Sequence, residues 1–204
     1  MELFVSAFVT LFVVIDPPGC APIYAGITRG ASAAQQRSMA LRAVFISALI
    51  LLAFALFGKP LLGTLGIDLN SFRIAGGIML FLIALEMVFE VRTHKREDRV
   101  QHIIEKPEPE DVSVFPMAMP MIAGPGSITT VMLLMSRTDG IEQRAVVLGA
   151  VGAALLLTLV ALLAAGRLMA LLGQKIEAVI TRLLGVLLAA LAVQFVIDGV
   201  RSSL

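Results

Sequence analysis

The sequence has few charged side chains for its length. Only 15% of its 204 residues are Asp, Glu, Lys or Arg, whereas 58% are hydrophobic, and the mean hydropathy is +0.95. Soluble domains carry about 25% charged residues. The formal net charge is +1, so no basic excess points to nucleic acid as a partner. This composition predicts an integral membrane protein whose surroundings are the lipid bilayer.

The sequence also lacks the residues from which most enzymes and metal sites are built. A single cysteine, Cys20, excludes an intrachain disulfide. The two histidines, His94 and His102, lie in a charged stretch with no further ligands at metal-binding spacing, so we expect no metal site. A Walker loop, a Gly-x-Ser-x-Gly elbow, an HExxH motif and a dinucleotide fingerprint are all missing. We therefore expect no enzymatic activity, no cofactor and no ATP-driven transport by this chain.

Long apolar stretches take up most of the sequence. A helix needs roughly 20 mostly apolar residues to cross the hydrocarbon core of a bilayer. These stretches do not offer the polar face that a helix of a soluble bundle needs. The first lacks a preceding positive region, so we expect it to stay in the mature protein rather than to be cleaved as a signal peptide. The sequence predicts an all-α membrane protein with six transmembrane helices, at 3–27, 41–63, 72–91, 114–136, 145–166 and 180–200.

The distribution of Lys and Arg predicts the orientation of these spans. The connections after the first, third and fifth spans hold eleven of these residues, and the opposite side holds five. Because cytoplasmic loops carry an excess of Lys and Arg, we expect the first group in the cytoplasm and both termini outside it. Residues 92–112 form the one long polar connection, which we expect to be a cytoplasmic linker.

The two halves of the sequence resemble each other. The segment "IDPPGC" at 15–20 aligns with "IAGPGS" at 122–127, and "FRIAGGIML" at 72–80 aligns with "TRLLGVLLA" at 181–189. Chance similarity between apolar segments accounts for the helix matches, but poorly for two Pro-Gly interruptions at corresponding places. Each half has three spans, so the second half enters the membrane upside down. We therefore expect an inverted-topology 3+3 repeat, with repeat one at 1–91 and repeat two at 113–204.

The prolines predict that spans one and four are broken near mid-membrane. Proline interrupts a helix but suits the first turn of a new one, and it moves the preceding residue out of the α region. In span one we expect Asp16 and Pro17 to be extended, with a second half-helix starting near Pro18. In span four we expect an extended Gly124 and a half-helix starting near Pro125.

A new helix start leaves backbone N–H groups without partners and carries about half a positive charge. Two such starts facing one point of the membrane would bind an anion such as a carboxylate. Asp16 could receive a substrate ammonium, carry a coupling proton, or simply cap its own half-helix. Helix starts beside one acid suit a zwitterion. We expect the open N–H donors at Gly19, Cys20 and Ala21 in the first half, and at Gly126, Ser127 and Ile128 in the second.

The candidate substrate-binding residues are therefore Asp16, Pro18, Gly19, Cys20, Gly124, Pro125, Gly126 and Ser127. Glu86 and its repeat counterpart Gln194 are candidates for a pathway, although both lie toward the ends of their spans, where an interfacial position explains them slightly better. Gly76, Gly77 and Gly185 are expected to allow close contacts between helices, as small residues do in membranes.

The segments "IDPPG…API", "SFRIAGGIMLFLIALEMVF", "FPMAMPMIAGPGSITTVMLL" and "LLGVLLAALAVQFVIDGV" resemble the MarC family of bacterial inner-membrane proteins. The resemblance covers nearly the whole chain except the polar linker. It implies six spans with both termini periplasmic, and its SnatA branch is associated with the transport of small neutral amino acids. Cys20 stands where many relatives are expected to carry Asn or another polar residue.

These observations lead to one expectation and two alternatives. The expectation is a secondary transporter of small neutral amino acids, coupled to protons or sodium, whose substrate lies between the two half-helix starts. One alternative is an exporter of drugs or other metabolites, which would use a wide apolar cavity and would not need Asp16. The other is a membrane scaffold or sensor without transport activity, which would have no cavity between its repeats.

Overall fold

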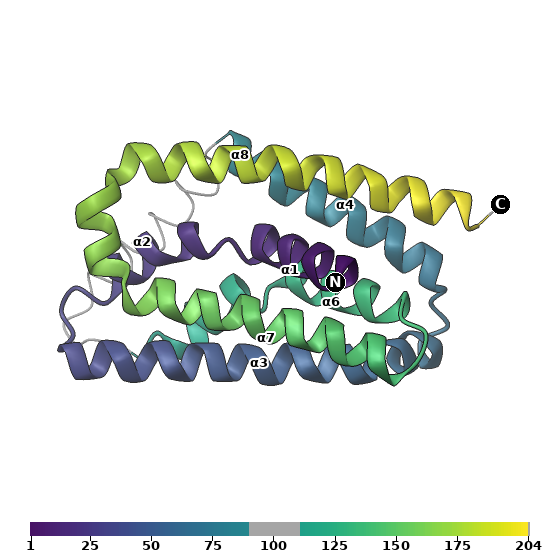
Figure 1. The fold of residues 1–204 in the computed structure, drawn as a ribbon, viewed down its shortest axis with the longest axis horizontal. Helices are drawn as coiled ribbons and strands as arrows, with labels where there is room; N and C mark the ends of the chain where they lie inside the picture. Colours follow the sequence, from purple (N-terminus) through teal and green to yellow (C-terminus); the bar gives the residue numbers. More distant parts are fainter. Residues whose placement is uncertain (90–110, 204) are drawn as a thin grey trace.

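The computed structural model describes residues 1–89 and 111–203, with the side chains of 168–175, 177 and 178 excepted. All regular elements of these residues are helices, and no strand occurs among them (Figure 1). The first half of the chain holds α1 (Glu2–Ile15), α2 (Pro17–Ile27), α3 (Ala33–Thr64) and α4 (Leu69–Val88). The second half holds η1 (Ser113–Ile122), α6 (Pro125–Ser136), α7 (Ile141–Leu163) and α8 (Ala165–Arg201).

The helices of the described residues fit five or six membrane spans. Five are long and apolar enough, with α1 and α2 together as one of them, and a sixth is formed if η1 and α6 are taken as one span with a bend of 52°. The prediction of an all-helical protein with several transmembrane helices is confirmed at this level. The inverted arrangement of the repeats and the depth of the two breaks in the bilayer stay predictions.

One predicted span starts later than its helix, because polar residues continue the helix beyond the apolar run. The second span was expected to start at residue 41, but α3 begins at Ala33, because Ser32 and Gln35 form a capping box. The Ser32 N–H donates to Gln35 Oε1 at 2.8 Å, and the Gln35 N–H donates to Ser32 Oγ at 3.3 Å. The sixth predicted span, 180–200, agrees with the candidate span Val179–Arg201, which is the C-terminal part of α8 (Ala165–Arg201).

The expected linker, 92–112, lies outside the described residues except for its last two. Asp111 forms an ion pair with Arg42 of α3, with 2.6 Å between its Oδ2 and the guanidinium Nη1. Hydrogen bonds from the side chain and the backbone of Ser113 hold the pKa of Asp111 below its usual value, and Arg42 lowers it further. His94 and His102 lie outside the described residues.

The helices pack around a core that runs along the bundle. Its fully buried members include Leu11 and Ile15 of α1, Leu51 of α3 and Ile122 of η1. In repeat two, α7 packs against α1 and α2, while in repeat one α3 packs against η1 and α6. Helix α4 lies beside the C-terminal part of α8 (Figure 1).

The predicted close helix contacts at glycines are confirmed. A Cβ added to Gly77 of α4 would lie 2.8 Å from the carbonyl oxygen of Ala192 in α8, and one added to Gly185 of α8 would lie 3.2 Å from the carbonyl oxygen of Ala84 in α4. A Cβ on Gly76 would instead lie far inside contact distance of the Thr129 methyl group of α6. The two adjacent glycines of α4 thus serve contacts with two different helices.

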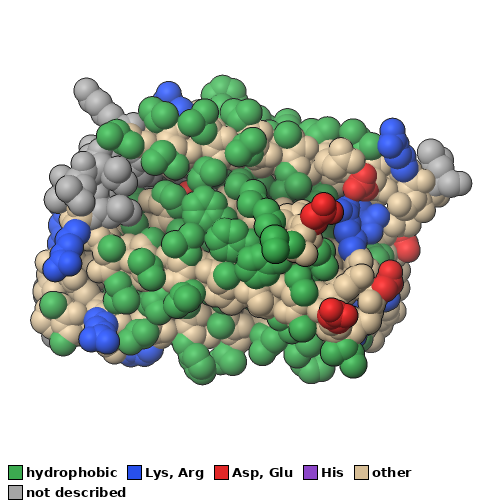
Figure 2. Space-filling view, viewed as in Figure 1, with side chains coloured by type: hydrophobic (Ala, Val, Ile, Leu, Met, Phe, Trp, Pro, Cys, Tyr) green, Lys and Arg blue, Asp and Glu red, His purple; other side chains and the backbone are tan. Residues whose placement is uncertain are grey.

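The outer surface matches a bilayer. Large hydrophobic side chains such as Leu52, Phe57, Leu82 and Leu156 are exposed on the helices. Figure 2 shows hydrophobic side chains across the middle of the molecule, Lys and Arg at its left end, and charges of both signs at its right end. An apolar belt between two charged ends is the surface that a membrane-spanning bundle requires.

Candidate functional site

The first helix start is built by a single left-handed residue. Asp16 ends α1 and precedes α2 with φ 55° and ψ 63°, and α2 begins at Pro17. The expectation of an extended Asp16 and Pro17 is therefore wrong, whereas the restart expected near Pro18 falls within one residue of its predicted position. Asp tolerates the left-handed region because its short side chain bonds locally, and here Asp16 Oδ1 accepts the Gly19 N–H at 3.1 Å. Pro17 then takes the first helical position, where a missing N–H costs nothing.

This geometry leaves no open donor in the first turn of α2. The Asp16 N–H donates to the Phe12 carbonyl oxygen at 3.0 Å, and Pro17 and Pro18 have no N–H. The Gly19 N–H is taken by the Asp16 carboxylate, and the Cys20 N–H donates to the Asp16 carbonyl oxygen at 2.9 Å. The prediction of open donors at Gly19 and Cys20 is wrong, because Asp16 caps the helix that follows it.

The second helix start is different, because it has no cap. Gly124 is extended, with φ −79° and ψ 174°, and α6 begins at Pro125, both as predicted. No side chain caps this start. Gly126 and Ser127 occupy the second and third helical positions, where an N–H has no acceptor inside the helix. The Ile128 N–H donates to the Gly124 carbonyl oxygen at 3.0 Å, so the prediction of an open donor at Ile128 is wrong.

The structure brings the start of α6 against α1 close to Asp16. A Cβ added to Gly126 would lie 3.3 Å from Cγ1 of Val14, two residues before Asp16, and 3.2 Å from Cδ2 of Leu80 in α4. Asp16 is fully buried and Ser127 is 2% exposed. The uncapped start of α6 therefore packs at Gly126 against α1 and α4, two residues along α1 from the buried Asp16.

The other candidate residues surround this region with different exposure. Gly19 and Cys20 of α2 are buried and Pro18 is half-buried, whereas Pro125 is exposed. The Cys20 thiol donates to the Ile15 carbonyl oxygen at 3.4 Å. Gly124 is buried, and a Cβ there would overlap the Pro120 carbonyl oxygen, so only glycine fits this position.

Thr130 of α6 is a buried polar residue that was not among the candidates from the sequence. Its side chain is fully buried, and its Oγ1 has no hydrogen-bond partner among the described residues. Threonines within helices often bond back to carbonyl oxygens of their own helix, but Thr130 does not. Thr130 follows Gly126 by four residues and Ser127 by three, so all three lie on one side of α6. This helical spacing from the uncapped start is the signal that could have identified it.

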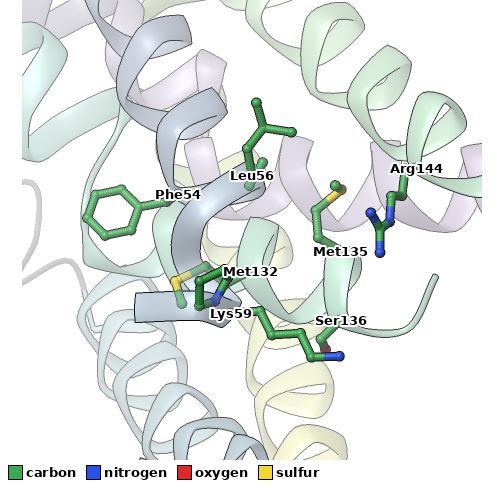
Figure 3. Close-up of a pocket in the computed structure, with 9 residues that line it drawn as sticks. Phe54, Leu56, Lys59, Met132, Met135, Ser136 and Arg144 are labelled. Atoms are coloured by element: carbon green, nitrogen blue, oxygen red, sulfur yellow. The ribbon is translucent and has the colours of Figure 1, made fainter. Parts of the chain in front are cut away.

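A hollow among the described residues lies away from the two helix starts. A pocket of about 470 Å³ opens where the ends of α3, α6 and α7 meet. Figure 3 shows Lys59 of α3 and Arg144 of α7 on its wall, together with Met132, Met135 and Ser136 of α6.

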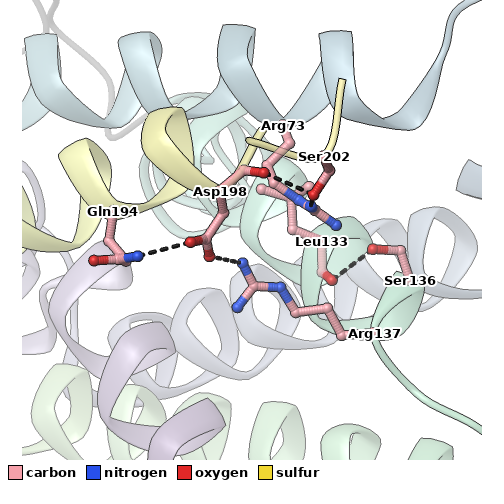
Figure 4. Close-up of polar contacts among 7 residues, drawn as sticks. All are labelled: Arg73, Leu133, Ser136, Arg137, Gln194, Asp198 and Ser202. Carbon is pink, nitrogen blue, oxygen red and sulfur yellow. Dashed lines mark hydrogen bonds and ion pairs between the residues drawn. The ribbon is translucent and has the colours of Figure 1, made fainter. Parts of the chain in front are cut away.

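The pathway candidates Glu86 and Gln194 lie in different surroundings. Gln194 is exposed on α8, and its Nε2 donates to Asp198 Oδ1 at 2.7 Å. Asp198 also pairs with Arg137 at 2.7 Å, and Ser202 beside it bonds Arg73 (Figure 4). Gln194 thus belongs to a polar cluster at the end of α8 rather than to the buried site. Glu86 is half-buried on α4.

Comparison with known proteins gives one consistent result. The family model described as "MarC family integral membrane protein" matches residues 1–204. The UPF0056 membrane protein MJ1677 of Methanocaldococcus jannaschii is 34% identical over 207 residues, covering 100% of this chain and 98% of the relative. The UPF0056 membrane protein YvbG of Bacillus subtilis is 35% identical over 197 residues, covering 97% of this chain and 93% of the relative. No solved structure matches the chain.

Proposed function

Because the chain belongs to the MarC family of integral membrane proteins, we propose that it is a secondary transporter of small neutral amino acids. The substrate is held between the helix starts that follow Asp16 and Gly124. One observation carries the proposal: the uncapped start of α6 packs at Gly126 against Val14 of α1, two residues before the buried Asp16.

The two sides of this region have opposite electrostatic character. The start of α6 offers the N–H groups of Gly126 and Ser127 and the positive end of a helix dipole, which together suit a substrate carboxylate. Asp16 suits a substrate ammonium. An ionised carboxylate has about four acceptor sites, and the bond from the Gly19 N–H uses one of them. A single carboxylate can therefore accept from a helix N–H and from an ammonium group at the same time.

The packing around α6 favours a small substrate. Gly126 is closely surrounded by Val14, Leu80 and Ile83, each within 3.3 Å of the position of an added Cβ. Because a methyl group at Gly126 would already press on these neighbours, α1 and α4 must move away from α6 to admit any substrate, and a small substrate needs the least movement. Glycine, alanine, serine and threonine fit this requirement.

Alternating access would come from movement of one repeat against the other. The packing of α3 against η1 and α6 corresponds to the packing of α7 against α1 and α2, as an inverted repeat requires. In this proposal the chain lies in the inner membrane with both termini periplasmic, and the gradient of protons or sodium drives transport.

Transport by the purified protein in proteoliposomes tests the proposal. We expect labelled glycine, alanine, serine or threonine to exchange, and a pH or sodium gradient to drive its accumulation. Ser127→Ala should raise the KM for the transported amino acid, because it removes a polar group from the site. If folded protein exchanges none of the four amino acids, the proposal is wrong. Export of an apolar drug that does not depend on Asp16 would favour an exporter instead.

A further inference from the structure

We propose that the pocket between α3, α6 and α7 binds the phosphate headgroup of an anionic membrane lipid. This site is separate from the region around Asp16 and does not depend on the proposed transport activity. Its volume is about 470 Å³, within the range of small-ligand sites. Its wall combines two cations, Lys59 and Arg144, with apolar groups from Phe54, Met132 and Met135.

The two cations come from different helices and share the same hollow. Lys59 lies on α3 and Arg144 in the first turns of α7, on either side of the last turn of α6 (Figure 3). Among the described residues, neither side chain has an ion pair or a hydrogen bond. Both residues are exposed, so both charges can reach a ligand. Two positive charges without counterions attract an anion.

The two cations are not needed as hydrogen-bond donors to the last carbonyl oxygens of α3 and α6, because other groups donate to them. Lys and Arg near a helix C-terminus often bond its last carbonyl groups. At the end of α3, the Pro60 carbonyl oxygen accepts the Thr64 hydroxyl at 3.0 Å. At the end of α6, the last carbonyl oxygens also have donors: Leu133 from Ser136 Oγ at 2.8 Å, Leu134 from the Arg137 N–H at 3.2 Å, and Met135 from Thr138 Oγ1 at 2.7 Å.

The position of the pocket indicates that its anionic ligand is a lipid rather than a free anion. Lys59 lies five residues before the end of α3, Ser136 is the last residue of α6, and Arg144 is the fourth residue of α7. The pocket thus lies at the ends of apolar helices, at the level expected of lipid headgroups. Phe54, Leu56 and Met132 continue the wall toward the middle of the bundle. A phosphate with attached acyl chains uses both parts of this wall, whereas a free anion uses only the cations.

Lipid binding to the purified full chain, measured by native mass spectrometry, tests the proposal. Phosphatidylglycerol and phosphatidylcholine with identical acyl chains are titrated separately. We expect the protein to retain phosphatidylglycerol in preference. Lys59→Gln/Arg144→Gln should weaken phosphatidylglycerol binding roughly 30-fold, because each cation near the surface contributes about a fivefold gain in affinity for an anionic lipid. Free glycerol phosphate at the same concentrations should not compete.

Matched variants separate this pocket from general surface charge. Arg29→Gln/Arg37→Gln removes two exposed cations elsewhere on the molecule and should retain the preference for phosphatidylglycerol. Lys59→Arg/Arg144→Lys keeps both charges and should bind nearly as the unmodified protein does. The proposal is overturned if Lys59→Gln/Arg144→Gln binds phosphatidylglycerol unchanged, or if the two lipids bind alike. Efficient competition by glycerol phosphate would assign the pocket to a free anion instead.

Discussion

The contact between α4 and α8 gives a prediction with a calculable magnitude. A Cβ added to Gly77 would lie 2.8 Å from the Ala192 carbonyl oxygen and 2.7 Å from Cγ2 of Val196. Ordinary contacts of carbon atoms lie near 3.5 Å, so Gly77→Ala should move α4 away from α8 by roughly 0.7 Å. Because the Ala192 atom is backbone, the strain cannot be relieved by a side-chain rotation. Overpacking of this kind costs about 1–3 kcal/mol.

The matched control is Gly152→Ala in α7, because no atom lies within 4 Å of an added Cβ there. Both variants gain the same helix propensity, so the difference in stability between them isolates the overpacking. For a protein of this size, about 1–3 kcal/mol corresponds to a difference in Tm of roughly 2–12 °C. Thermal unfolding in detergent, followed by circular dichroism, measures it. Equal Tm values for the two variants would show that α4 and α8 are not in close contact at Gly77.

Three further variants test the local geometry by their Tm. Asp16→Ala should lower the free energy of unfolding by about 2 kcal/mol, because it removes the cap of α2 and places Ala in the left-handed region. An unchanged Tm would show that Asp16 neither caps α2 nor is needed for the left-handed conformation. Thr130→Val should raise the Tm, because the buried Thr130 hydroxyl has no partner among the described residues, which costs about 1–3 kcal/mol. The control Thr158→Val should not raise it, because the Thr158 hydroxyl donates to the Ala154 carbonyl oxygen at 2.8 Å. Equal changes in Tm for the two variants would contradict this difference. Asp111→Asn should slightly lower the Tm at pH 7, because the lowered pKa of Asp111 stabilises the fold while its carboxyl group is ionised. The difference in Tm from the unmodified protein should shrink as the pH falls below 3.8. A difference in Tm that grows in acid would contradict this prediction.

The sequence predicted the positions of the helix breaks better than their chemistry. Both restarts fall within one residue of their expected positions, since the effect of proline on a helix is local. The left-handed conformation of Asp16 could not be predicted, because the rule for residues before proline favours an extended one. Whether a helix start is capped depends on one side-chain rotamer. That rotamer makes Asp16 a cap in the first half, while Ala123 and Gly124 provide none in the second.

For contacts between distant segments, the sequence predicted that helices pack closely but not which helices are the partners. The small residues Gly76 and Gly77 indicated close packing, but their separate partners on α6 and α8 depend on how α4 is rotated in the bundle. The burial of Thr130 and its lack of a hydrogen-bond partner among the described residues also depend on how the neighbouring helices pack, so the sequence could not predict them. The pocket around Lys59 and Arg144 joins residues that are far apart in the sequence, so no local pattern predicts it.

The central claim is that a buried carboxylate and an uncapped helix start bind a zwitterion. Asp16→Asn tests it most directly, because Asn also tolerates the left-handed region and caps helices, so the substitution removes the charge and keeps both structural roles. Asp68→Asn is the matched control, since Asp68 caps α4 at an exposed position. Counterflow of labelled alanine in proteoliposomes should fall roughly tenfold or more in Asp16→Asn and be unchanged in Asp68→Asn. Alanine counterflow by Asp16→Asn at the level of the unmodified protein would contradict the claim.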